Sequence, residues 1–282
     1  PGYSNPQAGE GRAVVYHGSA AALGGSSWTV EGNQAGAAFG GSVATAGDVN
    51  GDGFDDVIVG APGNYYADPK TSGTSYVVFG KAAGFAAAMN LSSLDGNDGF
   101  RLDGVAAEDR LGLSVSSAGD VNGDGFDDVI VGAELADLHG NNSGSSYIVF
   151  GKASGFDAHM DLSSLDGSNG FRLDGVKEED FAGISVNAAG DVNNDGFDDL
   201  IIGTDITDGG TGSSYVIFGS ADVTGNQSLT EIAGTAAADH LQGTTAAEYL
   251  SAGADDDMLA GGGGADKFDG GEGDDVISLA DL

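Results

Sequence analysis

The sequence predicts an all-β protein in which β-propeller blades, about 3.5 of them, are followed by a short parallel β-roll. Three observations lead to this prediction. An acidic segment recurs at Asp48, Asp120 and Asp191, which are 72 and 71 residues apart. Each repeat contains four short runs rich in Val, Ile, Phe and Tyr, as propeller blades do. From Gly234 the period changes to nine residues, which is typical of a β-roll.

The four runs are clearest in the second repeat, where they read LSVSSAG, DVIVGA, SYIVFG and FRLDG; we call them A, B, C and D. Clusters of Gly, Asn, Asp and Ser bound them, so each run is expected to be a strand. Residues 12–18 align with run C and residues 28–32 with run D, so the chain begins in mid-blade. We therefore expect the chain to be a fragment of a longer polypeptide. Its incomplete set of blades would leave sheet edges exposed, through which copies of the chain could associate.

The amino-acid composition restricts the kinds of partner that the chain can bind. The 282 residues include 52 glycines and no cysteine, and the formal net charge is -35. Only nine residues are Lys or Arg, so nucleic acid and anionic membrane surfaces are expected to be repelled. No run of 18 apolar residues is present, so membrane insertion is not expected. Dense carboxylates suit Ca²⁺, which prefers hard oxygen ligands.

The acidic segments are the strongest candidate sites. We call residues 48–56 loop 1, residues 120–128 loop 2 and residues 191–199 loop 3. Each carries oxygen-bearing side chains at positions 1, 3, 5 and 9 and a glycine at position 6. This spacing fits a tight loop around one Ca²⁺, with the position-7 carbonyl as a further ligand. The expected metal ligands are Asp48, Asn50, Asp52, Phe54, Asp56, Asp120, Asn122, Asp124, Phe126, Asp128, Asp191, Asn193, Asp195, Phe197 and Asp199.

The same residue types occur in two other kinds of loop. A run of Asx-turns that merely links strands A and B would use the same residue types. An EF-hand starts similarly, but its position-12 Glu is replaced by Val59 and Val131, and a β-like run follows in place of a helix. The sequence therefore favours a strand-linked calcium loop.

The repeat resembles the FG-GAP repeat of integrin α-subunit propellers and of many bacterial surface proteins. The resemblance covers roughly residues 1–220 and includes Phe39-Gly40 and Gly60-Ala61-Pro62, both of which drift in the later copies. It implies four-stranded blades with a Ca²⁺ ion in the loop between the first two strands.

The nine-residue units place an acid at Asp257, Asp266 and Asp275, and the last two units fit G-G-x-G-x-D-x-U-x. They resemble the calcium-binding nonapeptide repeat of RTX proteins. That resemblance implies that turns two units apart share a side of the roll, which pairs Asp257 with Asp275 and Glu248 with Asp266. A flexible Gly/Asp linker is the alternative.

No catalytic motif is evident. The four histidines lie in unrelated contexts, and the acids Asp103 and Asp109 recur one repeat later, which favours structural roles. We expect no enzyme activity and no cofactor besides Ca²⁺. The expected domains are blades over residues 1–222, a linker over 223–233 and a roll over 234–282.

The expected function is a secreted or cell-surface calcium-binding module for adhesion or surface structure. Two alternatives stay open: an ancillary domain of a secreted hydrolase, lyase or protease, and a subunit of an extracellular matrix or filament. Besides calcium ions, the partners left open are a protein or glycan ligand on a propeller face and further copies of the chain.

Overall fold

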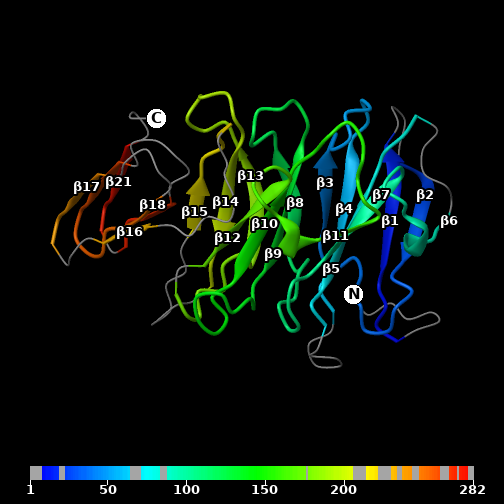
Figure 1. Cartoon of the computed structure of the whole chain (residues 1–282), viewed down its shortest axis with the longest axis horizontal. Coiled ribbons are helices and arrows are strands. Elements are labelled where there is room, and N and C mark those ends of the chain that lie inside the picture. Colours follow the sequence, from blue (N-terminus) through cyan, green and yellow to red (C-terminus); the bar gives the residue numbers. More distant parts are fainter. Residues whose placement is uncertain are drawn as a thin grey trace.

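A computed structural model describes residues 8–18, 23–63, 71–82, 88–175, 177–205, 214–221, 230–233, 237–242, 248–260, 267–271 and 273–278. Its elements are β-strands and two single-turn 3₁₀ helices, so the predicted all-β class is confirmed. Figure 1 shows the sheets standing side by side along the long axis of the molecule, from the N-terminal hairpin at one end to the roll at the other.

Two complete blades form as predicted, with strands A to D hydrogen-bonded in sequence order and antiparallel. The first blade consists of β3 (Val43–Gly47), β4 (Asp56–Ala61), β5 (Thr74–Val78) and β7 (Gly99–Asp103). The second consists of β8 (Val115–Gly119), β9 (Asp128–Ala133), β10 (Ser145–Val149) and β12 (Gly170–Asp174). Runs A to D are therefore the four strands of one blade.

The third blade departs from the prediction of a full unit. Within the described residues it has three strands, β13 (Ser185–Gly190), β14 (Asp199–Gly203) and β15 (Ser214–Ile217). The physical reason lies in the sequence, because no FRLDG-like run follows SYVIFGS before the nine-residue units begin. The half-blade at the N-terminus is the hairpin of β1 (Arg12–Gly18) and β2 (Leu23–Glu31), in agreement with its alignment to strands C and D.

Two of the outer D strands, that of the half-blade and that of the first blade, receive an additional strand that was not predicted. The short strand β6 (Ala88–Met89) pairs in parallel with β2, and β11 (His159–Asp161) pairs in parallel with β7. The 3₁₀ helices η1 (Leu91–Ser93) and η2 (Leu162–Ser164) follow directly. The first and second blades thus each lend a strand to the outer edge of the unit before them, which covers an edge open to aggregation and ties neighbours together, whereas β12 receives none within the described residues.

The hydrophobic core lies between the blades. In β9, Val129 and Val131 pack into the cluster shared with the first blade, whereas Ile130 packs into the cluster shared with the third. This alternation is the two-residue period of a strand buried on both faces. Each inner strand therefore depends on the blades on both sides of it.

The C-terminal units form two parallel sheets, as a β-roll requires. One contains β16 (Thr230–Ala233), β18 (Glu248–Ser251) and β20 (Lys267–Asp269); the other contains β17 (His240–Gln242), β19 (Met258–Ala260) and β21 (Val276–Ser278). Partners are 18 residues apart, for example Leu241 with Leu259, so turns two units apart do share a side. The sheet begins at Thr230, inside the segment expected to be the linker.

The roll packs against the free face of the third blade. Phe218, which directly follows β15, lies in one buried cluster with Leu250, Leu259 and Phe268 of the roll. The rings of Phe218 and Phe268 meet edge to face, with centroids 6.2 Å apart. Ile277, at the apolar position of its nine-residue unit, is exposed on β21, the last strand that the structure describes.

Candidate calcium-binding loops

Each acidic loop joins strand A to strand B of its blade, as predicted. The strand pairing shifts by one residue just before each loop, after Thr45, Ser117 and Ala188. The glycine at each shift has a φ of 72 to 75°, a conformation that residues with a side chain rarely adopt. This bulge turns the chain out of the sheet, so that the following aspartate begins the loop.

Inside the loops, the candidate side chains hold the backbone in a tight coil. In loop 1, the Asp48 carboxylate accepts from the amides of Asp52 at 2.9 Å and Gly53 at 2.8 Å. Asn50 Oδ1 accepts from the same Asp52 amide, and Asp52 Oδ1 accepts from Phe54. Loops 2 and 3 repeat these bonds at 2.9 to 3.1 Å. Positions 1, 3 and 5 are thus brought together in one turn in every copy.

The position-9 aspartate lies deeper. Asp56 is buried, and its two oxygens accept from the amides of Val49 at 3.0 Å and Gly80 at 2.7 Å. Burial, with a smaller contribution from the Asp52 and Asp48 carboxylates, raises the pKa of Asp56 to about 7. Burial likewise raises the pKa of Asp128 to about 8 and also raises that of Asp199.

This donor set fits a hard divalent cation. The described residues include no Lys, Arg or His that forms an ion pair with Asp56, Asp128 or Asp199, although each is buried close to two further carboxylates. A buried carboxylate without a counter-ion is costly, and calcium bound by oxygen ligands would remove that cost. As the side chains stand, no three His, Cys, Asp or Glu residues of the described chain form a closed cluster. The proposed ligands are therefore spread along each loop and do not form a preassembled coordination site.

The roll offers a second candidate arrangement. The structure brings Asp257 and Asp275 together, since the Asp257 amide donates to Asp275 Oδ1 at 3.0 Å. Asp257 is buried and accepts from the Asp239 amide through Oδ1 at 2.6 Å, whereas its Oδ2 has no hydrogen-bond partner in the described chain. Such a buried oxygen suits a cation. Asp266 lies outside the described residues, so its expected pairing with Glu248 stays a prediction.

Sequence reasoning missed the aspartate at position 8. Asp127 and Asp198 do not bond within their own loops; each accepts from the backbone of the preceding loop. The only signal was that an aspartate stands at position 8 in all three copies, which did not distinguish a link between loops from a solvated surface charge.

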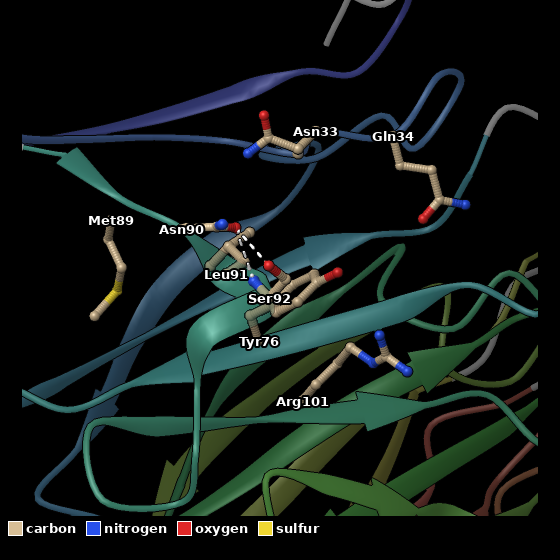
Figure 2. Close-up of a pocket in the computed structure, with 9 residues that line it drawn as sticks. Asn33, Gln34, Tyr76, Met89, Asn90, Leu91, Ser92 and Arg101 are labelled. Carbon is tan, nitrogen blue, oxygen red and sulfur yellow. Dashed lines mark hydrogen bonds between the residues drawn. The ribbon is translucent and has the colours of Figure 1, made fainter.

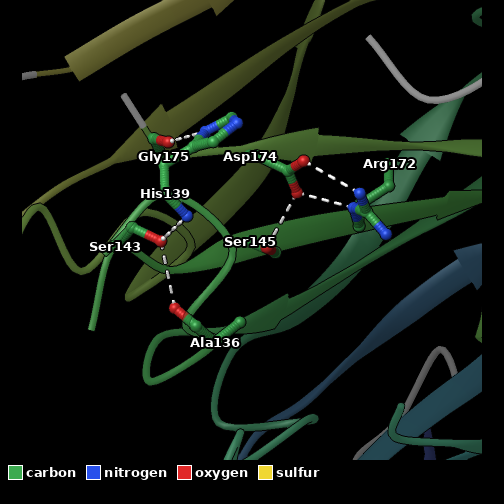
Figure 3. A network of polar contacts seen from close by, with 7 residues as sticks. All are labelled: Ala136, His139, Ser143, Ser145, Arg172, Asp174 and Gly175. Atoms are coloured by element: carbon green, nitrogen blue, oxygen red, sulfur yellow. Dashed lines mark hydrogen bonds and ion pairs between the residues drawn. The ribbon is translucent and has the colours of Figure 1, made fainter. Parts of the chain in front are cut away.

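The other titratable candidates have structural partners. Figure 3 shows Asp174 between Arg172 and Ser145, with Asp174 Oδ1 2.6 Å from Arg172 Nε and 2.9 Å from Ser145 Oγ. His139 donates from Nδ1 to the Gly175 carbonyl at 2.8 Å. Asp109, weighed as a possible catalytic acid, accepts from the Ala106 amide at 2.9 Å.

Comparison with known proteins identifies both repeats. The FG-GAP repeat model matches residues 39–78, 111–149 and 182–217, each of which spans one loop and the strands around it. The model of the RTX calcium-binding nonapeptide repeat matches residues 242–277. The three propeller blades are therefore FG-GAP repeats, and the roll is built from RTX repeats, which together indicate calcium binding.

The relatives of this chain include integrin α-subunits. Integrin alpha-3 of Cricetulus griseus is 30% identical over 181 residues, which are 62% of this chain and 15% of that protein. Integrin alpha-PS5 of Drosophila melanogaster is 34% identical over 172 residues, which cover 61% and 15% of the two chains. The chain thus spans about one seventh of the length of these relatives. Among the described residues, no helix is long and apolar enough to cross a membrane.

Proposed function

From the FG-GAP and RTX repeats that this chain carries, we propose that it is an extracellular or cell-surface calcium-binding module for adhesion or surface structure, without catalytic activity. The observation that supports the proposal most is the threefold recurrence of one loop geometry around a buried position-9 carboxylate that has no cationic partner among the described residues. The integrin relatives add a likeness to cell-surface adhesion receptors.

In this proposal each loop holds one Ca²⁺ through the side chains at positions 1, 3, 5 and 9 and the carbonyl at position 7. The ion supplies positive charge among carboxylates that otherwise repel one another. The chain itself positions the ligands. The bulge glycine directs the position-1 side chain into the loop, the Asx-turns hold the side chains at positions 3 and 5, and two backbone amides orient the position-9 carboxylate. Extracellular modules of this kind bind calcium at roughly 10⁻⁴ to 10⁻³ M, so millimolar calcium would fill them.

The domain division is proposed with one adjustment. The blades extend to about residue 222, and the roll includes the strand that begins at Thr230. Asp257 and Asp275 are the proposed roll ligands on the described side, with Asp266 proposed for the other.

A ligand of the module is proposed to bind at the junction between the half-blade and the first blade, where a pocket of about 630 Å³ opens. Figure 2 shows the amides of Asn33 and Gln34 on one side of it and Tyr76, Ser92 and Arg101 on the other. None of the described residues that line the pocket carries a carboxylate, although the chain is strongly acidic. Amides, hydroxyls and an aromatic ring suit a neutral glycan or a polar peptide segment.

Self-association is the second candidate function, and one observation favours it. Val43 of the first blade is 60% exposed, whereas its equivalents Val115 and Val186 are buried by the blade before them. An exposed apolar face that is buried elsewhere in the same molecule is suited to a further blade from another copy. Concentration-dependent light scattering would test it, and a monomer at every concentration would argue against it.

Calcium binding is tested by counting ions. Equilibrium dialysis of the full chain should show one fewer bound calcium in each of the variants Asp52→Ala, Asp124→Ala and Asp195→Ala. Position 5 is chosen because its side chain is exposed and its removal leaves the core intact. An unchanged count in all three variants would contradict the proposal.

A further inference from the structure

We propose that neighbouring calcium loops bind cooperatively, and that Asp127 and Asp198 are the positioning residues that couple them. The inference rests on the proposed function, since it concerns how its three loops act on one another. It assigns a role to position 8, which is not one of the proposed ligands.

The first junction joins loop 1 to the second blade through three hydrogen bonds. Asp127 Oδ2 accepts from the backbone amide of Asp48 at 2.7 Å, and the Asp127 amide donates to the Asp48 carbonyl at 3.4 Å. The amide of Lys152, just beyond strand β10, donates to the Val49 carbonyl at 3.0 Å. Positions 1 and 2 of loop 1 are thereby clamped by loop 2 and its blade.

The second junction repeats the first. Asp198 Oδ2 accepts from the Asp120 amide at 3.0 Å, and the Asp198 amide donates to the Asp120 carbonyl at 3.1 Å. The amide of Ser220 donates to the Val121 carbonyl at 2.9 Å. The same three bonds at two junctions indicate a device that belongs to the repeat and not a chance surface contact.

The residue at position 4 of each loop also depends on whether a further loop follows. A Cβ built on Gly51 would lie 2.4 Å from the ring of Phe126, and one built on Gly123 would lie 2.5 Å from the ring of Phe197. Loop 3, after which no further loop comes in the described chain, has Asn194 at this position. Glycine therefore occurs where the next loop's phenylalanine covers position 4, and a side chain occurs where position 4 is exposed in the described structure.

These contacts connect proposed ligands directly. Asp48 is a position-1 ligand whose backbone Asp127 holds, and Asp127 precedes Asp128, the position-9 ligand of loop 2. The arrangement also places the Asp127 carboxylate beside loop 1, where a bound cation offsets its repulsion with the other acids. An ion in loop 1 therefore favours the Asp127 position that orders loop 2, and by linkage the effect is reciprocal.

The test follows each loop separately by NMR. The amides of Gly53, Gly125 and Gly196 each donate to the position-1 carboxylate of their own loop, so each reports on one site. In the full chain, we expect Asp52→Ala to abolish the calcium response of Gly53. It should also raise the calcium concentration that half-saturates Gly125 by about fivefold or more.

A double-mutant cycle isolates the role of Asp127. In an Asp127→Ala background, Asp52→Ala should change the half-saturation of Gly125 by less than about twofold, because the link is already broken. Asp127→Asn, which keeps an acceptor oxygen, should retain part of the coupling and guards against misfolding in the alanine variant. Asp55→Ala is the matched control, because Asp55 bonds to no other loop in the described chain.

The outcomes separate the two claims. Coupling that persists unchanged in Asp127→Ala, or that is lost equally in Asp55→Ala, overturns the inference while the loops remain calcium sites. Glycine amides that do not respond to calcium in the unaltered chain would reject the proposed function itself, and the coupling with it.

Discussion

The second and third blades carry nearly the same motif, yet the same positions differ in burial. Ile130 in the middle of the second blade is fully buried, whereas its equivalent Ile201 is 38% exposed. Val121 at position 2 of loop 2 is buried, whereas Val192 of loop 3 is 46% exposed. The difference is the next blade, which covers Ile130 and Val121 and is replaced beside the third blade by the partly covering roll. A repeat therefore derives its core, and the support of its loop, from its neighbour.

Calcium removal should have the largest effect, because it acts on all three blades at once. At a hundredfold excess over Kd, each loop would contribute about 2.7 kcal/mol, so three loops would contribute about 8 kcal/mol. Thermal unfolding in EGTA should therefore occur far below the temperature found in calcium at a hundredfold excess over Kd, which is about 10 to 100 mM for sites of roughly 10⁻⁴ to 10⁻³ M. Magnesium at the same ionic strength is the control, and equal melting temperatures in calcium and EGTA would contradict the shared dependence.

Replacing one isoleucine by alanine in the second blade, and its equivalent in the third, measures directly how the difference in burial affects stability. Ile130→Ala should lower the free energy of unfolding by about 2–5 kcal/mol, because it leaves a cavity between two blades. Ile201→Ala should cost less than about 1 kcal/mol, because its side chain is already partly solvated. Urea denaturation of both variants in calcium checks the pair, and equal losses would mean that the third blade is covered in solution.

The sequence was sufficient to predict whatever depends on one repeat alone. Strands A to D and the three loops follow from local patterns, since alternation and turn residues determine them, whereas the 18-residue pairing of the roll follows from the resemblance to RTX repeats. It could not predict β6 and β11, because strands of two and three residues carry no readable pattern. Nor could the sequence distinguish Asp127 from Asp55. Asp127 accepts a hydrogen bond from the preceding loop, whereas Asp55 bonds to no other loop in the described chain. The difference depends on the neighbouring blade and not on the residue type.

Exchanging the position-4 residues tests the loop contacts more narrowly. Gly123→Asn should cost about 1–3 kcal/mol, because the new Cβ would meet the Phe197 ring. Asn194→Gly should change stability by less than about 1 kcal/mol, since that position faces no further loop. Differential scanning calorimetry of the two variants compares them, and a harmless Gly123→Asn would show that the loops do not touch as described.

The pH dependence in EGTA should give a small effect per pH unit, spread over a wide window. Burial raises the pKa of Asp128 to about 8 from an unfolded value of about 3.9, so the folded state binds more protons between these limits. Stability should therefore fall as pH rises through that window, by at most about 1.4 kcal/mol per pH unit for this group. Asp128→Asn should flatten the profile, and a metal-free protein whose stability rises with pH would contradict the assignment.

The most direct measurement is the anomalous electron density of crystals grown in millimolar calcium. The account predicts one ion in each of loops 1, 2 and 3, bound by the side chains at positions 1, 3, 5 and 9 and by the position-7 carbonyl. Density maps in which all three loops lack an ion, with Asp56, Asp128 and Asp199 still bonded only to backbone amides, would contradict it.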